Sequence, residues 1–296
     1  MIFERLAIVG VGLIGGSFAM AAREAGLARR ISGWDDRATL AAALSRGVID
    51  EVEEAFADGG YCHADLIYLA APVGGIIEFL QTHGRQLKRG AIVTDAGSTK
   101  RQVCRTARTA LAEGAHFIGG HPMAGSQQRG LSAARADLFR DSAYALIGDE
   151  PAQKGLEAIA LRLMIEAVRA IGARPVVISA ERHDHVVAAI SHTPQLLAAA
   201  LAASVAEAGD ELMPQLAGAG FADMTRLAAS HWSVWEDICA TNGDEIAAAL
   251  TGLIAMLERM HGELATGNLA QTAATFRSAN AFVGGLHEES DEQGNH

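Results

Sequence analysis

Short apolar runs and helical patterns alternate along the first 178 residues of the chain. Each run has the length of a buried β-strand, and the stretches between several of them carry apolar positions at helical spacing, as at 74–83, 100–113 and 154–171. Strands that alternate with helices are typical of a doubly wound parallel sheet, so an α/β fold is predicted. The predicted strands are 6–9, 30–34, 66–70, 91–95, 117–119, 143–147 and 175–178.

The pattern changes after residue 178, where only Ala- and Leu-rich helical stretches follow, at 181–208, 224–239, 244–262 and 269–284. Such composition favours helix, and nearly all-round apolar faces favour burial against other helices. We therefore expect a domain at 1–178, an all-helical domain at 179–286 and a polar, disordered tail at 287–296. Because a helical domain of this size has a small core, we expect it to pair with a second copy as a homodimer.

Composition excludes several classes of partner. The net charge is −11, from 24 basic and 35 acidic residues, which disfavours nucleic acid and anionic membranes. No apolar run approaches 18 residues, and no signal peptide precedes the first strand. The three scattered cysteines suit a reducing cytoplasm, and the 11 histidines show no metal-binding spacing, so no metal is expected.

A glycine-rich turn joins the first strand to the first helix. Gly10 permits a tight turn, Gly12 allows a pyrophosphate close to the backbone, and Gly15 allows the helix to pack on the strand. An acidic residue follows 20 positions after Gly15. The pattern predicts a dinucleotide site made by Gly10, Gly12, Leu13, Ile14, Gly15 and Asp35.

Asp35 also bears on the choice of cofactor. A carboxylate here accepts hydrogen bonds from ribose hydroxyls and repels a 2′-phosphate, which favours NAD over NADP. Arg37 is close enough in sequence to weaken the repulsion of the 2′-phosphate of NADP.

Polar residues follow several predicted strands, where ligands of such sheets bind. Pro72, Ser98 and His121 lie at these ends, where chemistry is expected, and we expect Pro72 to contact the cofactor. A structural role is the alternative for Ser98, as a helix N-cap, and for His121, as a turn residue. In the helical half, Arg226 follows a glycine-rich loop at 218–223, and an exposed helical arginine is the alternative there.

Three motifs make the pattern specific. The stretches GGHPMAGS at 119–126, SHTP at 191–194 and DMTR at 223–226 resemble those of the prephenate and arogenate dehydrogenases, the cyclohexadienyl dehydrogenases of tyrosine biosynthesis. The resemblance implies an N-terminal Rossmann domain and a helical dimerisation domain related to that of 6-phosphogluconate dehydrogenase, with the active site between them. It implies a NAD-dependent oxidative decarboxylation of prephenate or arogenate.

The resemblance also assigns roles to residues. His121 would accept the proton of the ring hydroxyl, Ser98 would bond near that hydroxyl and the nicotinamide, and Arg226 would hold a carboxylate. Substrate contacts are expected from His192, Gln195, Gln127 and Trp235. Gln195 stands where many members carry histidine, Gln127 where some carry glutamate, and Trp232 where proline is frequent, so substrate preference stays open.

Two other functions fit parts of the sequence. β-Hydroxyacid dehydrogenases and imine reductases share the two-domain plan but usually carry a lysine in the first C-terminal helix, and 181–208 contains none. A non-catalytic NAD-sensing module would not need Ser98, His121 and Arg226 to meet.

Overall fold

The computed structural model describes residues 2–54, 56, 62–125, 128–148 and 155–293. By its contacts the chain divides into two compact units, Met1–Glu245 and Ile246–His296. This division lies inside a helix, and the first helix of the all-α segment, Ala180–Val187, packs on the helix Arg101–Ala110 of the first half of the chain.

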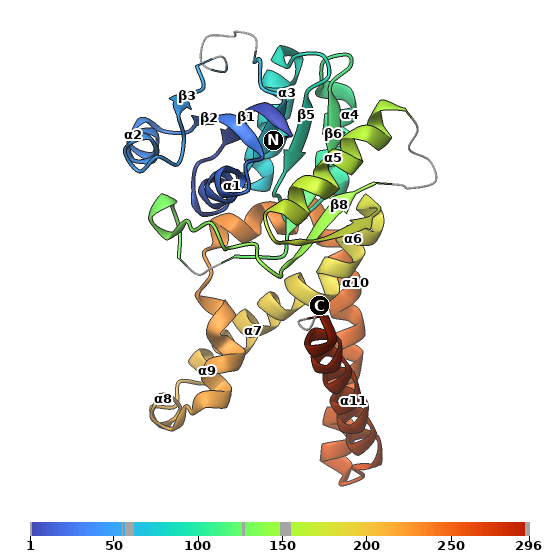
Figure 1. Cartoon of the computed structure of the whole chain (residues 1–296). Helices are drawn as coiled ribbons and strands as arrows, with labels where there is room; N and C mark the ends of the chain where they lie inside the picture. Colours follow the sequence, from blue (N-terminus) through green and yellow to red (C-terminus); the bar gives the residue numbers. More distant parts are fainter. Residues whose placement is uncertain (1, 55, 57–61, 126–127, 149–154, 294–296) are drawn as a thin grey trace. The chain divides into compact units, whose positions relative to one another are not determined.

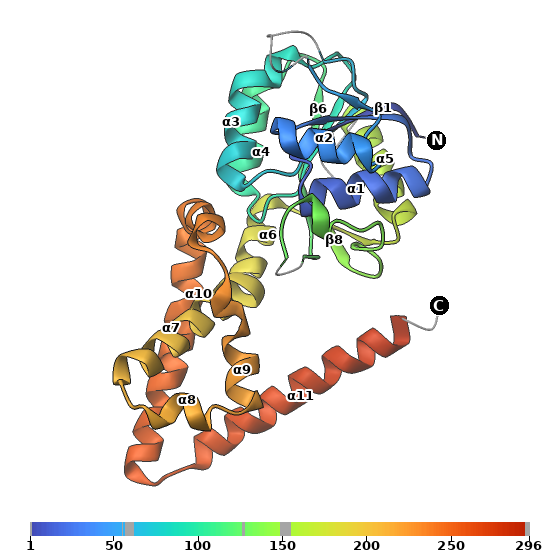
Figure 2. The same ribbon diagram turned by 90° about the vertical axis from the view of Figure 1, so that its left-hand side faces the viewer.

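A six-stranded parallel sheet forms the centre of the first unit, with the order β3-β2-β1-β4-β5-β6. Helices cover both of its faces: α1, α2 and α5 pack on one and α3 and α4 on the other (Figures 1 and 2). The doubly wound fold is thereby confirmed. The strands are β1 (Phe3–Val9), β2 (Ala28–Trp34), β3 (Glu51–Val52), β4 (Leu66–Leu69), β5 (Ile92–Asp95) and β6 (His116–Ile118). The helices are α1 (Leu13–Glu24), α2 (Arg37–Ser45), α3 (Val73–His83), α4 (Arg101–Ala110) and α5 (Leu156–Ala170), with 3₁₀ turns at Gly84–Gln86 and Leu131–Ala133.

A second, three-stranded sheet was not expected from the sequence. It contains β7 (Gly120–Pro122), β8 (Ala143–Ile147) and β9 (Arg174–Ile178), with β7 antiparallel to β8. The chain leaves the main sheet after β6 and passes so close to β5 that a Cβ on Gly120 would lie 2.5 Å from the Asp95 carbonyl oxygen. His121 therefore lies within a short strand and not in a loop.

The helix expected at 181–208 is interrupted. It consists of α6 (Ala180–Val187), a π-helical turn (Ala188–His192) and α7 (Thr193–Ala208). Pro194 has no N–H to donate and its ring crowds the preceding turn, which accounts for the irregularity. Residues 180–208 are long and apolar enough to cross a membrane by length and composition alone, but core helices pass the same test and several of the run's polar side chains are buried within the protein.

The expectations for residues 218–262 were partly wrong. The predicted glycine-rich loop is largely α9 (Ala219–Thr225), and Arg226 begins a 3₁₀ turn (Arg226–Ala229) where a regular helix was expected. Helix α10 (Trp232–Thr266) joins two predicted helices across a kink at Asn242, whose φ is −136°. The remaining helices are α8 (Leu212–Leu216) and α11 (Ala270–Gln293), and α11 includes most of the expected tail.

Candidate active site

The glycine turn after β1 has the shape that a dinucleotide requires. Gly10 has φ +87°, and a Cβ on Gly15 would lie 1.9 Å from the Gly10 carbonyl oxygen, so larger residues are excluded at both positions. A Cβ on Gly12 would meet nothing within 4 Å, which leaves the backbone open to a ligand. Helix α1, which contains Leu13 and Ile14, has no side-chain cap among the described residues. Its first N–H groups are thus available to a phosphate.

Asp35 follows β2 beside this turn. Its carboxylate accepts hydrogen bonds from the backbone N–H groups of Val11, at 2.7 Å, and Asp36, at 2.7 Å. These bonds orient the carboxylate, and each oxygen keeps a lone pair for a ribose hydroxyl. The exposed Asp36 caps α2 and adds a second negative charge.

Helix α10 meets the start of α3, which follows β4. The backbone N–H of Gly74 donates to the Asp237 carboxylate at 2.7 Å. Pro72 is exposed at the N-cap position of α3, at the carboxyl edge of the sheet where the cofactor is expected. Helix α10 therefore contacts the first half of the chain at the carboxyl edge of the main sheet, the edge where ligands of such sheets bind.

A buried ion pair holds β5 and β7 together. The side chains of Asp95 and Lys100 are both fully buried and form an ion pair, and the Lys100 ammonium also donates to the Gly120 carbonyl at 2.7 Å. Asp95 in turn accepts from the N–H groups of Gly97, at 2.9 Å, and Gly120, at 3.0 Å. This clamp positions the loop that carries Ser98 and the strand that carries His121.

Ser98 is half-buried in that loop. The alternative role as a helix N-cap is wrong, because α4 begins at Arg101 with Lys100 at the N-cap position. Within the described part of the chain its hydroxyl has no hydrogen-bond partner, so it is free to bond a ligand.

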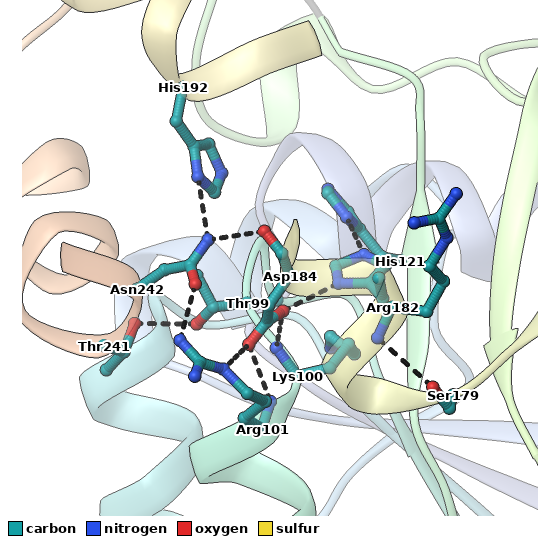
Figure 3. A network of polar contacts seen from close by, with 12 residues as sticks. Thr99, Lys100, Arg101, His121, Ser179, Arg182, Asp184, His192, Thr241 and Asn242 are labelled. Carbon is teal, nitrogen blue, oxygen red and sulfur yellow. Dashed lines mark hydrogen bonds and ion pairs between the residues drawn. The ribbon is translucent and has the colours of Figure 1, made fainter. Parts of the chain in front are cut away.

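His121 belongs to a chain of buried side chains that sequence reasoning missed (Figure 3). Its Nδ1 lies 2.9 Å from Nε2 of His183, whose Nδ1 lies 2.8 Å from the Asp184 carboxylate. Burial, together with nearby His183 and Lys100, holds the pKa of His121 well below its usual range, so the ring is neutral. The adjacent His183 and Asp184 are the only sign of this chain in the sequence, and His183 lies 62 residues from His121.

Asp184 connects three helices. Its carboxylate accepts the first backbone N–H groups of α4, from Lys100 at 2.7 Å and Arg101 at 2.9 Å. Burial tends to raise the pKa of Asp184, but hydrogen bonds from His183 and these N–H groups outweigh it and lower the pKa. Asn242, at the kink of α10, donates to the Asp184 carbonyl at 2.9 Å.

His192 and Trp235, both predicted substrate contacts, lie together. Their rings meet edge to face with centroids 5.9 Å apart, and Nδ1 of His192 lies 3.3 Å from the Asn242 side-chain nitrogen. His192 is 1% exposed, and burial lowers its pKa to about 4. The buried Nε2 of His192 has no hydrogen-bond partner in the described structure.

Gln195 does not present a free amide. Its Nε2 donates to the Leu227 carbonyl at 2.7 Å and its Oε1 accepts from Ser230 at 3.4 Å, so it holds the turn that begins with Arg226. Arg226 itself is exposed and has no hydrogen bond or ion pair to any described residue. Gln127 lies outside the described residues.

The chain matches two family models over most of its length. The model described as "Prephenate dehydrogenase, nucleotide-binding domain" matches residues 18–177, and "Prephenate dehydrogenase, dimerization domain" matches 179–278. The two matches meet at residue 178.

Individual proteins agree with these matches. The chain is 32% identical to a prephenate dehydrogenase of Bacillus subtilis, over 96% of this chain and 76% of the relative. It is 33% identical to a cyclohexadienyl dehydrogenase of Zymomonas mobilis, over 90% of each protein. The structure of prephenate dehydrogenase from A. aeolicus in complex with hydroxyphenyl propionate and NAD+ matches with a TM-score of 0.87 and 26% identity, over 96% of this chain and 98% of that one. Both halves of this chain thus match their counterparts in these enzymes, and the chain belongs to the prephenate dehydrogenase family.

Proposed function

We propose that this dehydrogenase catalyses the NAD-dependent oxidative decarboxylation of prephenate to 4-hydroxyphenylpyruvate in the cytoplasm, with arogenate as a second candidate substrate. One observation carries the proposal: a buried, neutral imidazole, His121, lies beside the ligand edge of a sheet with an intact dinucleotide turn. Family membership argues against the β-hydroxyacid dehydrogenase and sensor alternatives. The division into domains 1–178 and 179–286 is part of the proposal.

The reaction needs an acceptor for the hydride, an acceptor for the hydroxyl proton, and loss of the ring carboxylate. The glycine turn and Asp35 would hold NAD, which would supply the acceptor for the hydride of the ring carbon that bears the hydroxyl. His121 accepts the hydroxyl proton as that oxygen becomes a carbonyl, and the free hydroxyl of Ser98 supports the same oxygen. The ring carboxylate then leaves as carbon dioxide, its bonding electrons make the ring aromatic and convert the carbonyl to a phenolate, and this oxygen takes the proton back from His121 to give the product's hydroxyl.

The substrate carries two carboxylates, and the net charge of the chain does not attract them. Arg226 supplies a guanidinium without a protein partner among the described residues, suited to a bidentate grip on one carboxylate. Gln195 supports this contact because its bond to the Leu227 carbonyl holds the turn that begins with Arg226. We propose that His192 and Trp235 line the same pocket.

The assay that tests this function is direct. Purified protein is incubated with prephenate and NAD, and NADH formation is followed, with arogenate and NADP in parallel arms. Turnover of prephenate with NAD is expected. A higher kcat/KM with arogenate would favour the second substrate, and no turnover of either ring acid with either cofactor would reject the proposal.

The orientation of Asp35 supports NAD as the cofactor, and replacing Asp35 by Asn should relax that choice. Two charges about 4 Å apart near a protein surface interact by about 4 kcal/mol, so removing the carboxylate lowers the cost of a 2′-phosphate. The ratio of kcat/KM for NADP to that for NAD should rise about 10- to 100-fold. Arg37→Ala is the matched control and should move the ratio the other way. An unchanged ratio in the Asn variant would remove Asp35 from cofactor selection.

We propose a homodimer formed through the helical domain. In the second unit, large apolar side chains are exposed, among them Leu264 at 63%, Phe276 at 62% and Phe282 at 67%. Isolated soluble chains seldom expose so many large apolar groups on two helices. Light scattering should give twice the chain mass of 30.9 kDa, and a monomer at assay concentrations would contradict the dimer.

A further inference from the structure

Two of the buried imidazoles, His121 and His192, are joined by one continuous hydrogen-bond network through Asp184 (Figure 3). A neutral imidazole carries one hydrogen, and its location decides which nitrogen donates and which accepts. The partners in this network are specific enough to place that hydrogen on each ring.

The first branch starts from the Asp184 carboxylate. Its low pKa makes it ionised and therefore an acceptor only, so Nδ1 of His183 must carry a hydrogen. Burial lowers the pKa of His183 despite the opposing effect of Asp184, so this ring is neutral and its Nε2 is a lone pair. Nδ1 of His121 faces that lone pair and must donate to it. The Nε2 of His121 is then left as an acceptor.

The second branch starts from Arg101. Its guanidinium donates to the Asn242 side-chain oxygen at 2.9 Å, and this bond sets the orientation of the amide. In the flipped amide, the NH2 group would face the guanidinium, and both groups are donors. The Asn242 nitrogen therefore faces the Asp184 carbonyl and Nδ1 of His192. An amide nitrogen only donates, so Nδ1 of His192 accepts.

The neutral His192 ring must therefore carry its hydrogen on Nε2. This nitrogen is buried, and no described residue accepts from it. A buried N–H without a partner is unfavourable, and such a group calls for a ligand or water that completes it. Trp235 packs edge-on against the ring and restrains its orientation.

We infer that this network sets the two imidazoles in opposite tautomers, with His121 as an acceptor at Nε2 and His192 as a donor at Nε2 for a carboxylate oxygen of the substrate. His183, Asp184 and Asn242 act as positioning residues. The identity of the acceptor atom rests on the proposed function, whereas the tautomers rest on the structure alone.

Charged and titratable groups near the rings decide whether each ring takes up a second proton. Lys100 and His192 disfavour protonation of His121, and Lys100 also acts on His183, where Asp184 and Asp95 oppose it. Asp184 favours protonation of His192 and His183 disfavours it. The network should therefore keep its hydrogen positions at neutral pH.

The hydrogens are located by ¹⁵N NMR of the full chain with ¹⁵N-labelled histidine, in which ring-nitrogen shifts report the tautomer. The His121→Asn and His192→Asn spectra identify the two rings among the 11 histidines. At neutral pH we expect His121 to carry hydrogen on Nδ1 and His192 on Nε2. The same tautomer on both rings, or a charged ring, would overturn the inference whether or not the protein turns over prephenate.

Two variants test the positioning roles. His183→Phe should move the His121 hydrogen to Nε2, the form that free imidazole favours, and lower kcat about 100-fold or more, since the acceptor is lost. Asn242→Asp keeps the bond to Arg101 but offers His192 an acceptor, so the His192 hydrogen should move to Nδ1 and the KM for prephenate should rise about tenfold or more with a smaller change in kcat. Gln81→Glu, on the exposed surface of α3, makes the same amide-to-carboxylate change and is the matched control, which should change neither. Unmoved hydrogens in folded variants would contradict the positioning roles.

Discussion

Replacing His121 by Asn should lower kcat about 10²- to 10⁴-fold, the usual contribution of a positioned general base. Asparagine keeps a polar group of similar length but its amide cannot take up a proton. The affinity for NAD should change little, since the residues that we propose to hold the other end of the cofactor, the glycine turn and Asp35, are unchanged. Steady-state kinetics with prephenate and a separate NAD titration measure the two effects.

The pH profile gives a second check on the same residue. The proposed role of His121 as a proton acceptor requires a neutral ring. Burial lowers the pKa of His121 well below 6.5, so activity should be lost only as the pH falls through this depressed value. The acid limb of kcat/KM should therefore lie below pH 6.5. The exposed His231→Asn variant should behave like the natural protein. Full activity of the His121 variant would remove this imidazole from the mechanism.

Replacing Lys100 by Met should destabilise the protein by about 3–5 kcal/mol, because it leaves the fully buried Asp95 without its cation. The ammonium also holds the Gly120 carbonyl, so the strand with His121 should loosen as well. Urea unfolding followed by circular dichroism measures the loss.

A surface ion pair provides the matched control for this change. Arg135 and Asp137 form an ion pair at 2.8 Å with side chains that are 57% and 53% exposed. Exposed pairs contribute about 0–1 kcal/mol, so Arg135→Met should have a small effect. Adding Asp95→Asn to the Lys100 variant should recover part of the lost stability, since the isolated charge is gone while the amide oxygen still accepts from one of the two N–H groups, that of Gly97 or that of Gly120. Equal effects of the two single variants would show that the buried pair is not what stabilises the β5–β7 junction.

The dinucleotide turn was predictable because its causes are local. Gly10 is required by a backbone dihedral and Gly15 by contact with a carbonyl only five residues earlier. Asp35 directly follows the next strand, and parallel pairing of β1 with β2 brings it beside the turn. The alternation of apolar runs likewise predicted the main sheet, because strand and helix periods are visible within a few residues.

The second sheet and the start of the helical half were less predictable. β7 is three residues long, too short to show an alternation of apolar and polar residues, so only its pairing with β8 makes it a strand. The π-helical turn at Ala188–His192 depends on Pro194, whose position was visible in the sequence. The 3₁₀ turn at Arg226–Ala229 replaced an expected helix, and the sequence did not show the bond from Gln195 to the Leu227 carbonyl that holds it.

By itself, the sequence determined the doubly wound sheet, the cofactor turn and the motifs of the family. Only the tertiary structure decided which groups surround His121 and His192, because those partners come from segments 50 to 62 residues away. Local patterns follow from backbone sterics and side-chain periodicity, whereas buried hydrogen bonds between distant segments form only when the whole core has packed.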